Sequence, residues 1–174
     1  MAWKLDMAHS AVEFSVRHMM ISTVKGNFKE FAADIDINPE DLTKSSVRAV
    51  IKAASIDTRE PQRNGHLVSA DFLDVEKYPE IVFQSRQVES LGGDRYRVEG
   101  DLTIKDTTRP VGLDVTFLGF QTSPYGVRAA GFEATTKISR EDFGLTWNVA
   151  LETGGVLVGD EIRISIDAEA NEVA

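Results

Sequence analysis

The sequence predicts an all-β fold: an eight-stranded antiparallel barrel with one helix in the 60–76 segment. Three observations point to it. Apolar and polar residues alternate along most of the chain, short turns join the alternating segments, and only one segment has helical spacing. A period of two is expected of strands with one buried face, and strands joined by short turns are usually antiparallel neighbours. Eight long strands can close into a barrel without exposed edges, although a β-sandwich remains the competing prediction.

The first elements are expected to form a β-hairpin. Trp3 to Leu5 is interpreted as a short edge segment, and the first full strand is predicted over about Ser10 to His18. Met19 to Val24 then form the turn. The inward face of this strand is predicted to carry Val12, Phe14, Val16 and His18.

The second arm of the hairpin begins at Gly26 and contains an irregularity. Its apolar residues alternate from Phe31 to Ile37, but Phe28 lies three residues before Phe31 and therefore has the wrong parity. We predict a β-bulge near Asn27 to Glu30, because one extra residue restores the alternation.

A third strand and the single helix follow. A short helical piece is expected at Asp41 to Thr43, and a strand at about Ser46 to Ser55. The segment Arg63 to Val75 spaces its apolar residues at helical intervals, and the helix must end before Tyr78, which precedes a proline. The helical spacing is that of Leu67, Val68, Phe72 and Val75.

Strand patterns return in the rest of the chain and complete the count of eight. A single helical turn is expected at Arg140 to Phe143. The remaining strands are predicted at Glu80 to Glu89, Tyr96 to Ile104, Pro110 to Phe120, Val127 to Ile138 and Glu161 to Glu169.

Composition excludes several classes of function. The 174 residues suit one domain, and a formal net charge of −9 without a basic stripe argues against a nucleic-acid partner. The absence of cysteine excludes thiol nucleophiles, disulfides and cysteine-ligated zinc. No apolar run reaches the length of a membrane span, so an integral membrane protein is not expected. The first residues do not resemble a signal peptide, so we expect a cytoplasmic protein, or a periplasmic or secreted one if a leader has been removed.

The histidines do not predict a metal site. His9 and His18 lie nine residues apart on one predicted strand, which places them roughly 30 Å apart on opposite faces. His66 has no carboxylate at a recognisable ligand spacing. We interpret His18 as a hydrogen-bonded interior histidine and His9 as a turn residue that pairs with local backbone, and we expect no metal and no cofactor.

Arg140 and the apolar faces carry the remaining functional signals. Arg140 could receive a polar ligand head, but an ion pair with Asp142 or with a neighbouring strand is the favoured interpretation. An eight-stranded barrel is either packed or holds one small ligand. Small residues on otherwise apolar faces slightly favour a cavity; these are Ala33, Ala49, Ala53, Ala130 and Ala134.

Taken together, several short motifs resemble those of the YceI-like proteins over nearly the whole chain. The resemblance implies a lipocalin-like barrel with a long apolar pocket for polyisoprenoids, isoprenoid quinones or other long lipids. Three positions depart from the family pattern, namely Asn64, Leu73 and Asp106. The motifs are His9-Ser10, Phe14, His18, Gly26, Phe28, Phe31, Arg63, His66-Leu67, Asp71-Phe72, Tyr78-Pro79, Gly100-Asp101-Leu102-Thr103, and Arg140 with Asp142-Phe143-Gly144.

The leading hypothesis is therefore non-enzymatic binding, carriage or storage of a long-chain isoprenoid or other lipid. One alternative is a cofactor-free enzyme with His18 as general base and Arg140 as electrostatic stabiliser; another is a packed barrel that serves protein contacts. A homodimer formed through an exposed edge is a further possibility. The predicted ligand-binding residues are Phe14, Val16, His18, Phe28, Phe31, Ile35, Phe72, Phe83, Leu102, Ile104, Phe132, Arg140, Phe143, Trp147 and Ile164.

Overall fold

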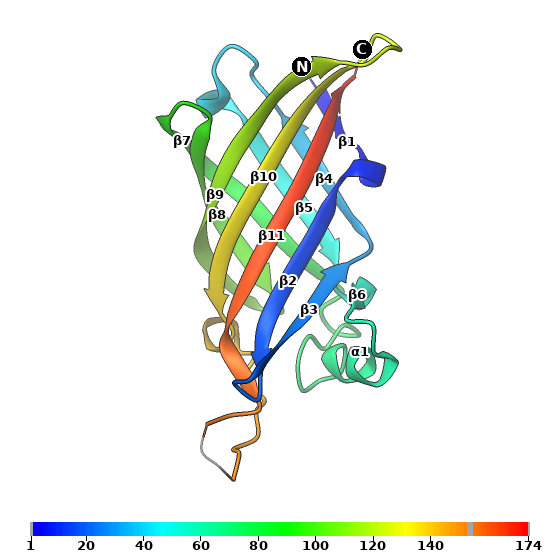
Figure 1. Ribbon diagram of the computed structural model, residues 1–174, viewed down its shortest axis with the longest axis vertical. Coiled ribbons are helices and arrows are strands. Elements are labelled where there is room, and N and C mark those ends of the chain that lie inside the picture. The colour runs from blue at the N-terminus through cyan, green and yellow to red at the C-terminus, as the bar shows by residue number, and fades with distance from the viewer. Residues whose placement is uncertain (1, 153–154, 174) are drawn as a thin grey trace.

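A computed structural model describes residues 2–152 and 155–173, and within them the chain forms one closed antiparallel sheet (Figure 1). The sheet closes because β1 pairs with both β4 and β11. The helix α1 spans Pro61–Leu67. The strands are β1 (Ala2–Leu5), β2 (Ala11–His18), β3 (Ser22–Phe28), β4 (Phe31–Asp36), β5 (Ser46–Lys52), β6 (Ile56–Asp57), β7 (Glu80–Gly92), β8 (Arg95–Ile104), β9 (Thr107–Thr122), β10 (Arg128–Ser139) and β11 (Val158–Glu172).

These segments make an eight-stranded barrel because three of its strands are interrupted. The 3-10 turn Met7–His9 separates β1 from β2, two residues separate β3 from β4, and the 3-10 turn Ala53–Ser55 separates β5 from β6. The two segments on either side of each interruption form one long strand. The strand made of β1 and β2 pairs with the strand made of β3 and β4, through β2–β3 and β1–β4. The strand made of β3 and β4 pairs in turn with the strand made of β5 and β6, through β4–β5 and β3–β6. The predicted closed barrel is confirmed, and the sandwich is excluded.

The prediction that Trp3 to Leu5 is an edge segment is wrong. Trp3 lies opposite Ile35 on one side and Glu172 on the other, so this short strand is paired on both sides. Its partners lie far away in the sequence, where local alternation gives no signal. The segment closes the barrel.

The predicted bulge near Asn27 to Glu30 is a break between two strands. β3 ends at Phe28, which lies opposite Val12, and β4 begins at Phe31, which lies opposite Ile51. Between them Lys29 leaves the ladder and donates its backbone N–H to the carbonyl of Ser55 at 3.1 Å. The predicted shift in alternation between Phe28 and Phe31 is present. It arises because residues 29 and 30 leave the sheet, not because of a bulge within a continuous strand.

The helix is shorter than the predicted Arg63 to Val75. It begins with Pro61 after Glu60, whose side chain accepts a hydrogen bond from the N–H of Gln62, and it ends at Leu67. The hydroxyl of Ser69 then donates to the carbonyl of His66 at 2.6 Å, a local bond that competes with helix continuation. The rest of the segment is a series of turns that still packs its apolar residues on the barrel.

The two ends of the barrel differ in what covers them. One end, here the α1 end, carries α1, the β2–β3 turn and the segment between β10 and β11, whereas both chain termini lie at the other, the N-terminal end (Figure 1). A small buried cluster belongs to the N-terminal end; it consists of Trp3, Ile37, Leu42, Ala130 and Ala170. The 3-10 turns Leu42–Lys44 and Glu141–Phe143 lie within about one residue of the predicted helical pieces.

Candidate ligand-binding cavity

The barrel encloses a cavity of about 630 Å³. Ligand pockets usually measure about 300–1,000 Å³. Among the described residues no large side chain is completely buried, because many interior side chains border this space instead of packing against other atoms. The interior is a cavity rather than the packed core that was the competing prediction.

Most of the residues predicted to bind a ligand lie in the cavity lining. Fourteen of the fifteen predicted residues line the cavity, and Phe143 does not. Phe143 is 2 % exposed and packs in the core beneath its 3-10 turn, so it supports the wall from behind. Contact of the other residues with a ligand stays a prediction. Those that line the cavity are Phe14, Val16, His18, Phe28, Phe31, Ile35, Phe72, Phe83, Leu102, Ile104, Phe132, Arg140, Trp147 and Ile164.

Two glycines allow phenylalanine rings to lie across neighbouring strands. Gly26 pairs with Phe14, and a Cβ at Gly26 would collide with the Phe14 ring and with the carbonyl of Asp57. Gly100 pairs with Ser85, and a Cβ there would collide with the Phe83 ring and with the carbonyl of Gln84. The Phe14 ring also contacts Phe28, with 5.5 Å between the ring centroids. These glycines therefore set the shape of the aromatic wall.

Several lining residues are absent from the predicted set. Strand β5 contributes Val47, Ala49 and Ile51, whose alternation was visible in the sequence. Ala49 is also one of the small residues from which a cavity was predicted. Further lining residues are His66, Leu67, Leu73, Val98, Val111, Leu113, Val115 and Ile162.

An aromatic cluster covers the cavity at the α1 end. The ring centroid of His66 lies 4.6 Å from that of Trp147 and 5.0 Å from that of Phe72, both in edge-to-face geometry. The imidazole Nε2 lies 2.9 Å from a carboxylate oxygen of Asp71. His66 lines the cavity while its side chain is 38 % exposed, so the cavity reaches solvent beside this residue.

The position of α1 depends on Asn64, one of the departures from the family pattern. Its Oδ1 accepts hydrogen bonds from the N–H and the hydroxyl of Thr58, and its Nδ2 donates to Asp57 at 3.1 Å. An aspartate at position 64 could not make this donation and would face a second carboxylate. Hydrogen bonds from the Arg59 N–H, Asn64 and Lys29 lower the pKa of Asp57 to about 2.

Arg140 holds the segment before β11 in place. Its guanidinium donates to the carbonyls of Leu145 at 2.7 Å and Gly159 at 2.8 Å, and to those of Trp147 and Val158 at 3.3 Å. The side chain is 5 % exposed, and this burial lowers its pKa against the opposing charges of nearby acids. The favoured interpretation was an ion pair with Asp142 or with a neighbouring strand. The guanidinium does contact the neighbouring strand β11, but it binds backbone carbonyls there rather than an acid, and sequence patterns do not reveal such partners.

His18 lines the cavity from the end of β2. Within the described part of the chain, the expected hydrogen bond to its ring does not occur. Its backbone carbonyl accepts hydrogen bonds from the N–H of Ile21 and the hydroxyl of Ser22. A general base is normally oriented by a second group, and His18 has no such group among these residues.

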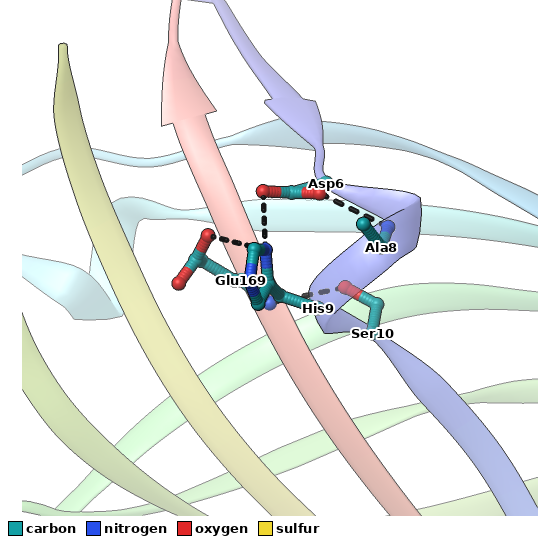
Figure 2. Close-up of polar contacts among 5 residues, drawn as sticks. All are labelled: Asp6, Ala8, His9, Ser10 and Glu169. Carbon is teal, nitrogen blue, oxygen red and sulfur yellow. Dashed lines mark hydrogen bonds and ion pairs between the residues drawn. The ribbon is translucent and has the colours of Figure 1, made fainter. Parts of the chain in front are cut away.

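His9 lies outside the barrel wall in a cluster that joins the beginning and the end of the chain (Figure 2). Its Nδ1 lies 2.9 Å from Asp6 and 3.5 Å from Glu169, and the hydroxyl of Ser10 accepts the N–H of Glu169. The prediction that the His9 side chain pairs with local backbone is wrong, because its partners are the side chains of Asp6 and Glu169. We call Asp6, His9, Ser10 and Glu169 the closure cluster.

The protonation equilibria of the closure cluster are linked. The hydrogen bond from His9 lowers the pKa of Asp6, and the same bond raises the pKa of His9. Contact with the Asp6 carboxyl raises the pKa of Glu169. The cluster therefore favours a charged imidazole between β1 and β11.

Over the residues that the structure describes, no helix is long and apolar enough to cross a membrane.

A closed antiparallel barrel around an apolar cavity defines a lipocalin-like class of protein. Within that class the chain belongs to the YceI-like family, whose YceI-like domain matches residues 3–170. A UPF0312 protein of Staphylococcus epidermidis is 37 % identical over 168 residues, which cover 96 % of this chain and 95 % of the relative.

Solved structures share the fold. BcnA of Burkholderia cenocepacia has a TM-score of 0.81 at 27 % identity, covering 95 % of this chain and 98 % of BcnA. A domain from Saccharophagus degradans, described as a polyisoprenoid binding domain implicated in plant cell wall breakdown, has a TM-score of 0.70 at 14 % identity and covers 98 % of each chain. The second likeness is one of fold alone.

Proposed function

We propose that this protein binds and carries a long apolar lipid, of the polyisoprenoid or isoprenoid-quinone class, inside the barrel. The apolar cavity of about 630 Å³ is the observation that carries the proposal. Family membership agrees with it, since a barrel of this fold from S. degradans is described as polyisoprenoid-binding. The chain of the lipid lies along the aromatic wall formed by Phe14, Phe28 and Phe83.

Hydrophobic transfer supplies the free energy of binding. Each CH₂ group removed from water contributes about 0.8 kcal/mol, so a chain of about ten carbons gains about 8 kcal/mol before the costs of association are subtracted. Few polar contacts are needed at this magnitude. Arg63 and Arg140 also line the cavity, but they already donate to protein oxygens, so their charges contribute little to recognition.

The test combines native mass spectrometry with a variant that fills the cavity. Ala49→Phe places a ring in the lining of β5, and Val50→Phe places the same ring on the opposite face of the same strand as a control. Wild-type protein and Val50→Phe are expected to retain a long-chain lipid, whereas Ala49→Phe retains about tenfold less. Equal retention by both variants at normal folding, or no lipid on any of them after exposure to farnesol or ubiquinone, contradicts the proposal.

Catalysis is the second candidate function, and the pair His66–Asp71 is the observation that favours it. A carboxylate 2.9 Å from an imidazole at a cavity mouth is the geometry of an oriented general base, which His18 lacks among the described residues. Recovery of the bound lipid chemically unchanged supports binding. Turnover of that lipid, lost in His66→Gln, would support an enzyme.

A further inference from the structure

The β2–β3 turn has a backbone that its residues do not favour. The N–H of Ile21 donates to the carbonyl of His18, and the two central residues Met19 and Met20 have φ angles of 52° and 62°. Hairpin turns with two positive φ angles are usually formed by Asn-Gly, because side chains with a Cβ are strained there. Met19 and Met20 therefore hold a backbone conformation that is unfavourable for them.

These side chains extend into solvent. Met19 is 40 % exposed, Met20 63 % and Ile21 81 %. Val149 and Val156, at 47 % and 39 %, lie on the neighbouring segment between β10 and β11. We call these five residues the apolar tip.

Direct contacts join the two parts of the apolar tip. The N–H of Met19 donates to the carbonyl of Leu157 at 2.8 Å. Met20 lies so close over Gly155 that a Cβ there would collide with its sulfur atom. The β2–β3 turn and the segment that carries Val149 and Val156 therefore lie side by side.

The β2–β3 turn and the segment between β10 and β11 lie at the α1 end of the barrel (Figure 1). His18 and Leu157, which flank the tip in sequence, both line the cavity. The exposed mouth residue His66 and its partner Trp147 belong to the same lining. A surface that binds the tip is thus placed next to the point where the cavity reaches solvent.

The charge around the hairpin differs from that of the whole protein. The chain has a formal net charge of −9, yet the hairpin contains no acidic residue from Phe14 to Gly26. Exposed Arg17 and Lys25 flank the turn, while the adjoining segment between β10 and β11 carries the exposed acids Glu141, Asp142 and Glu152. Apolar side chains at a tip with cations behind them suit the acyl region and the phosphate groups of a lipid bilayer.

We propose that the apolar tip inserts into the surface of a lipid bilayer and holds the mouth of the cavity against the membrane, where lipid enters and leaves. The proposal rests on the proposed function in one respect, since the cargo would reside in bilayers. A bilayer fits better than a second protein, because a specific protein interface buries about 800 Å² on each partner, more than five side chains at a hairpin end supply.

The decisive variant removes the apolar side chains and relieves the backbone at once. Met19→Asn with Met20→Gly gives the turn its preferred sequence, so the protein is expected to fold with an equal or higher melting temperature. Cosedimentation of full-length protein with phosphatidylcholine–phosphatidylglycerol vesicles is expected to weaken about tenfold or more. Binding by wild-type protein should change little in high salt, because apolar insertion dominates.

Tyr125→Ser is the matched control. Tyr125 is 93 % exposed on the β9–β10 turn at the N-terminal end, so its loss removes a large exposed side chain without touching the tip. Vesicle binding by this variant is expected to equal that of wild type. An equal loss in both variants would show that exposed apolar residues act anywhere on the surface, and it would overturn the proposal.

Site-specific labelling gives a second, independent measurement. The chain has no cysteine, so Ile21→Cys and Tyr125→Cys each create one attachment point for a polarity-sensitive dye. The dye at position 21 is expected to report an apolar environment on addition of vesicles, and the dye at position 125 is not. An unchanged signal at position 21 contradicts insertion.

The remaining outcomes separate this proposal from the proposed function. If wild-type protein self-associates through the tip and ignores vesicles, the tip is a protein interface and membrane docking is wrong. Binding of detergent-solubilised farnesol is measured in parallel and does not involve the tip. If wild-type protein does not bind farnesol, the proposed lipid-binding function is wrong. If it binds farnesol but not vesicles, only the proposal of membrane docking is wrong.

Discussion

Two groups of apolar residues at opposite ends of the barrel are buried to opposite extents. At the N-terminal end Trp3, Ile37 and Ala170 are 4 %, 2 % and 0 % exposed and pack into a small closed cluster. At the α1 end Met20 and Ile21 are 63 % and 81 % exposed on a strained turn. The difference teaches that the cluster around Trp3 stabilises the closed sheet, while the β2–β3 turn gives up local stability and keeps apolar side chains available for contacts outside the protein.

The largest expected effect tests this difference with the two tryptophans. Trp3→Ala should lower the free energy of unfolding by about 3–5 kcal/mol, because it empties a packed site. The ring centroid of Trp3 lies 5.9 Å from that of Phe120 at this site. Trp147→Ala, at the half-buried aromatic cover, should cost only about 1 kcal/mol but should speed lipid exchange. Urea unfolding and lipid-transfer kinetics measure the two quantities.

Trp3→Phe serves as the control for the closed end. The indole Nε1 of Trp3 is buried and, within the described residues, has no hydrogen-bond partner. Phenylalanine removes that unpaired N–H and keeps most of the packing, so the loss should be well below that of Trp3→Ala. Equal costs for Trp3→Ala and Trp147→Ala would show that the two ends are not distinct in packing.

A smaller effect is expected from two glycines near the α1 end. Gly26→Ala should destabilise the protein by about 1–3 kcal/mol, since the added Cβ collides with the Phe14 ring and the carbonyl of Asp57. Gly65→Ala, inside the short helix with nothing within 4 Å of the added atom, should stabilise by about 0.5–1 kcal/mol. Thermal unfolding of both variants tests whether the aromatic wall, rather than glycine flexibility, requires Gly26.

Local alternation was sufficient for the wall of the barrel but not for its closure. The faces of Phe14 and Phe83 follow from a period of two, and so does the lining of the cavity. The double pairing of Trp3 with Ile35 and Glu172 depends on contacts across the whole chain, and nothing in a short window predicts it.

The same limit applies to polar groups and to strain. Arg140 donates to carbonyls, and every residue has a carbonyl, so its partners leave no mark in the sequence. The methionines of the β2–β3 turn look like ordinary apolar residues until their positive φ angles are known. His9 meets Glu169 only because the sheet closes on itself, and residue spacing along the sequence does not predict such a contact.

The smallest effect concerns the closure cluster at the N-terminal end. Asp6 raises the pKa of His9 above its ordinary value of 6.5, so the charged imidazole stabilises the fold fully below pH 6.5, and this contribution is lost as pH rises through the folded pKa. The pKa of Asp6 is lowered from 3.8, so its carboxylate stabilises the fold above pH 3.8, and this contribution is lost as pH falls through the folded pKa. The stability difference between wild type and His9→Gln should therefore be larger at pH 5.5 than at pH 8.5. Asp6→Asn should flatten that dependence, and a difference that grows with pH would show that the ion pair does not hold β1 against β11.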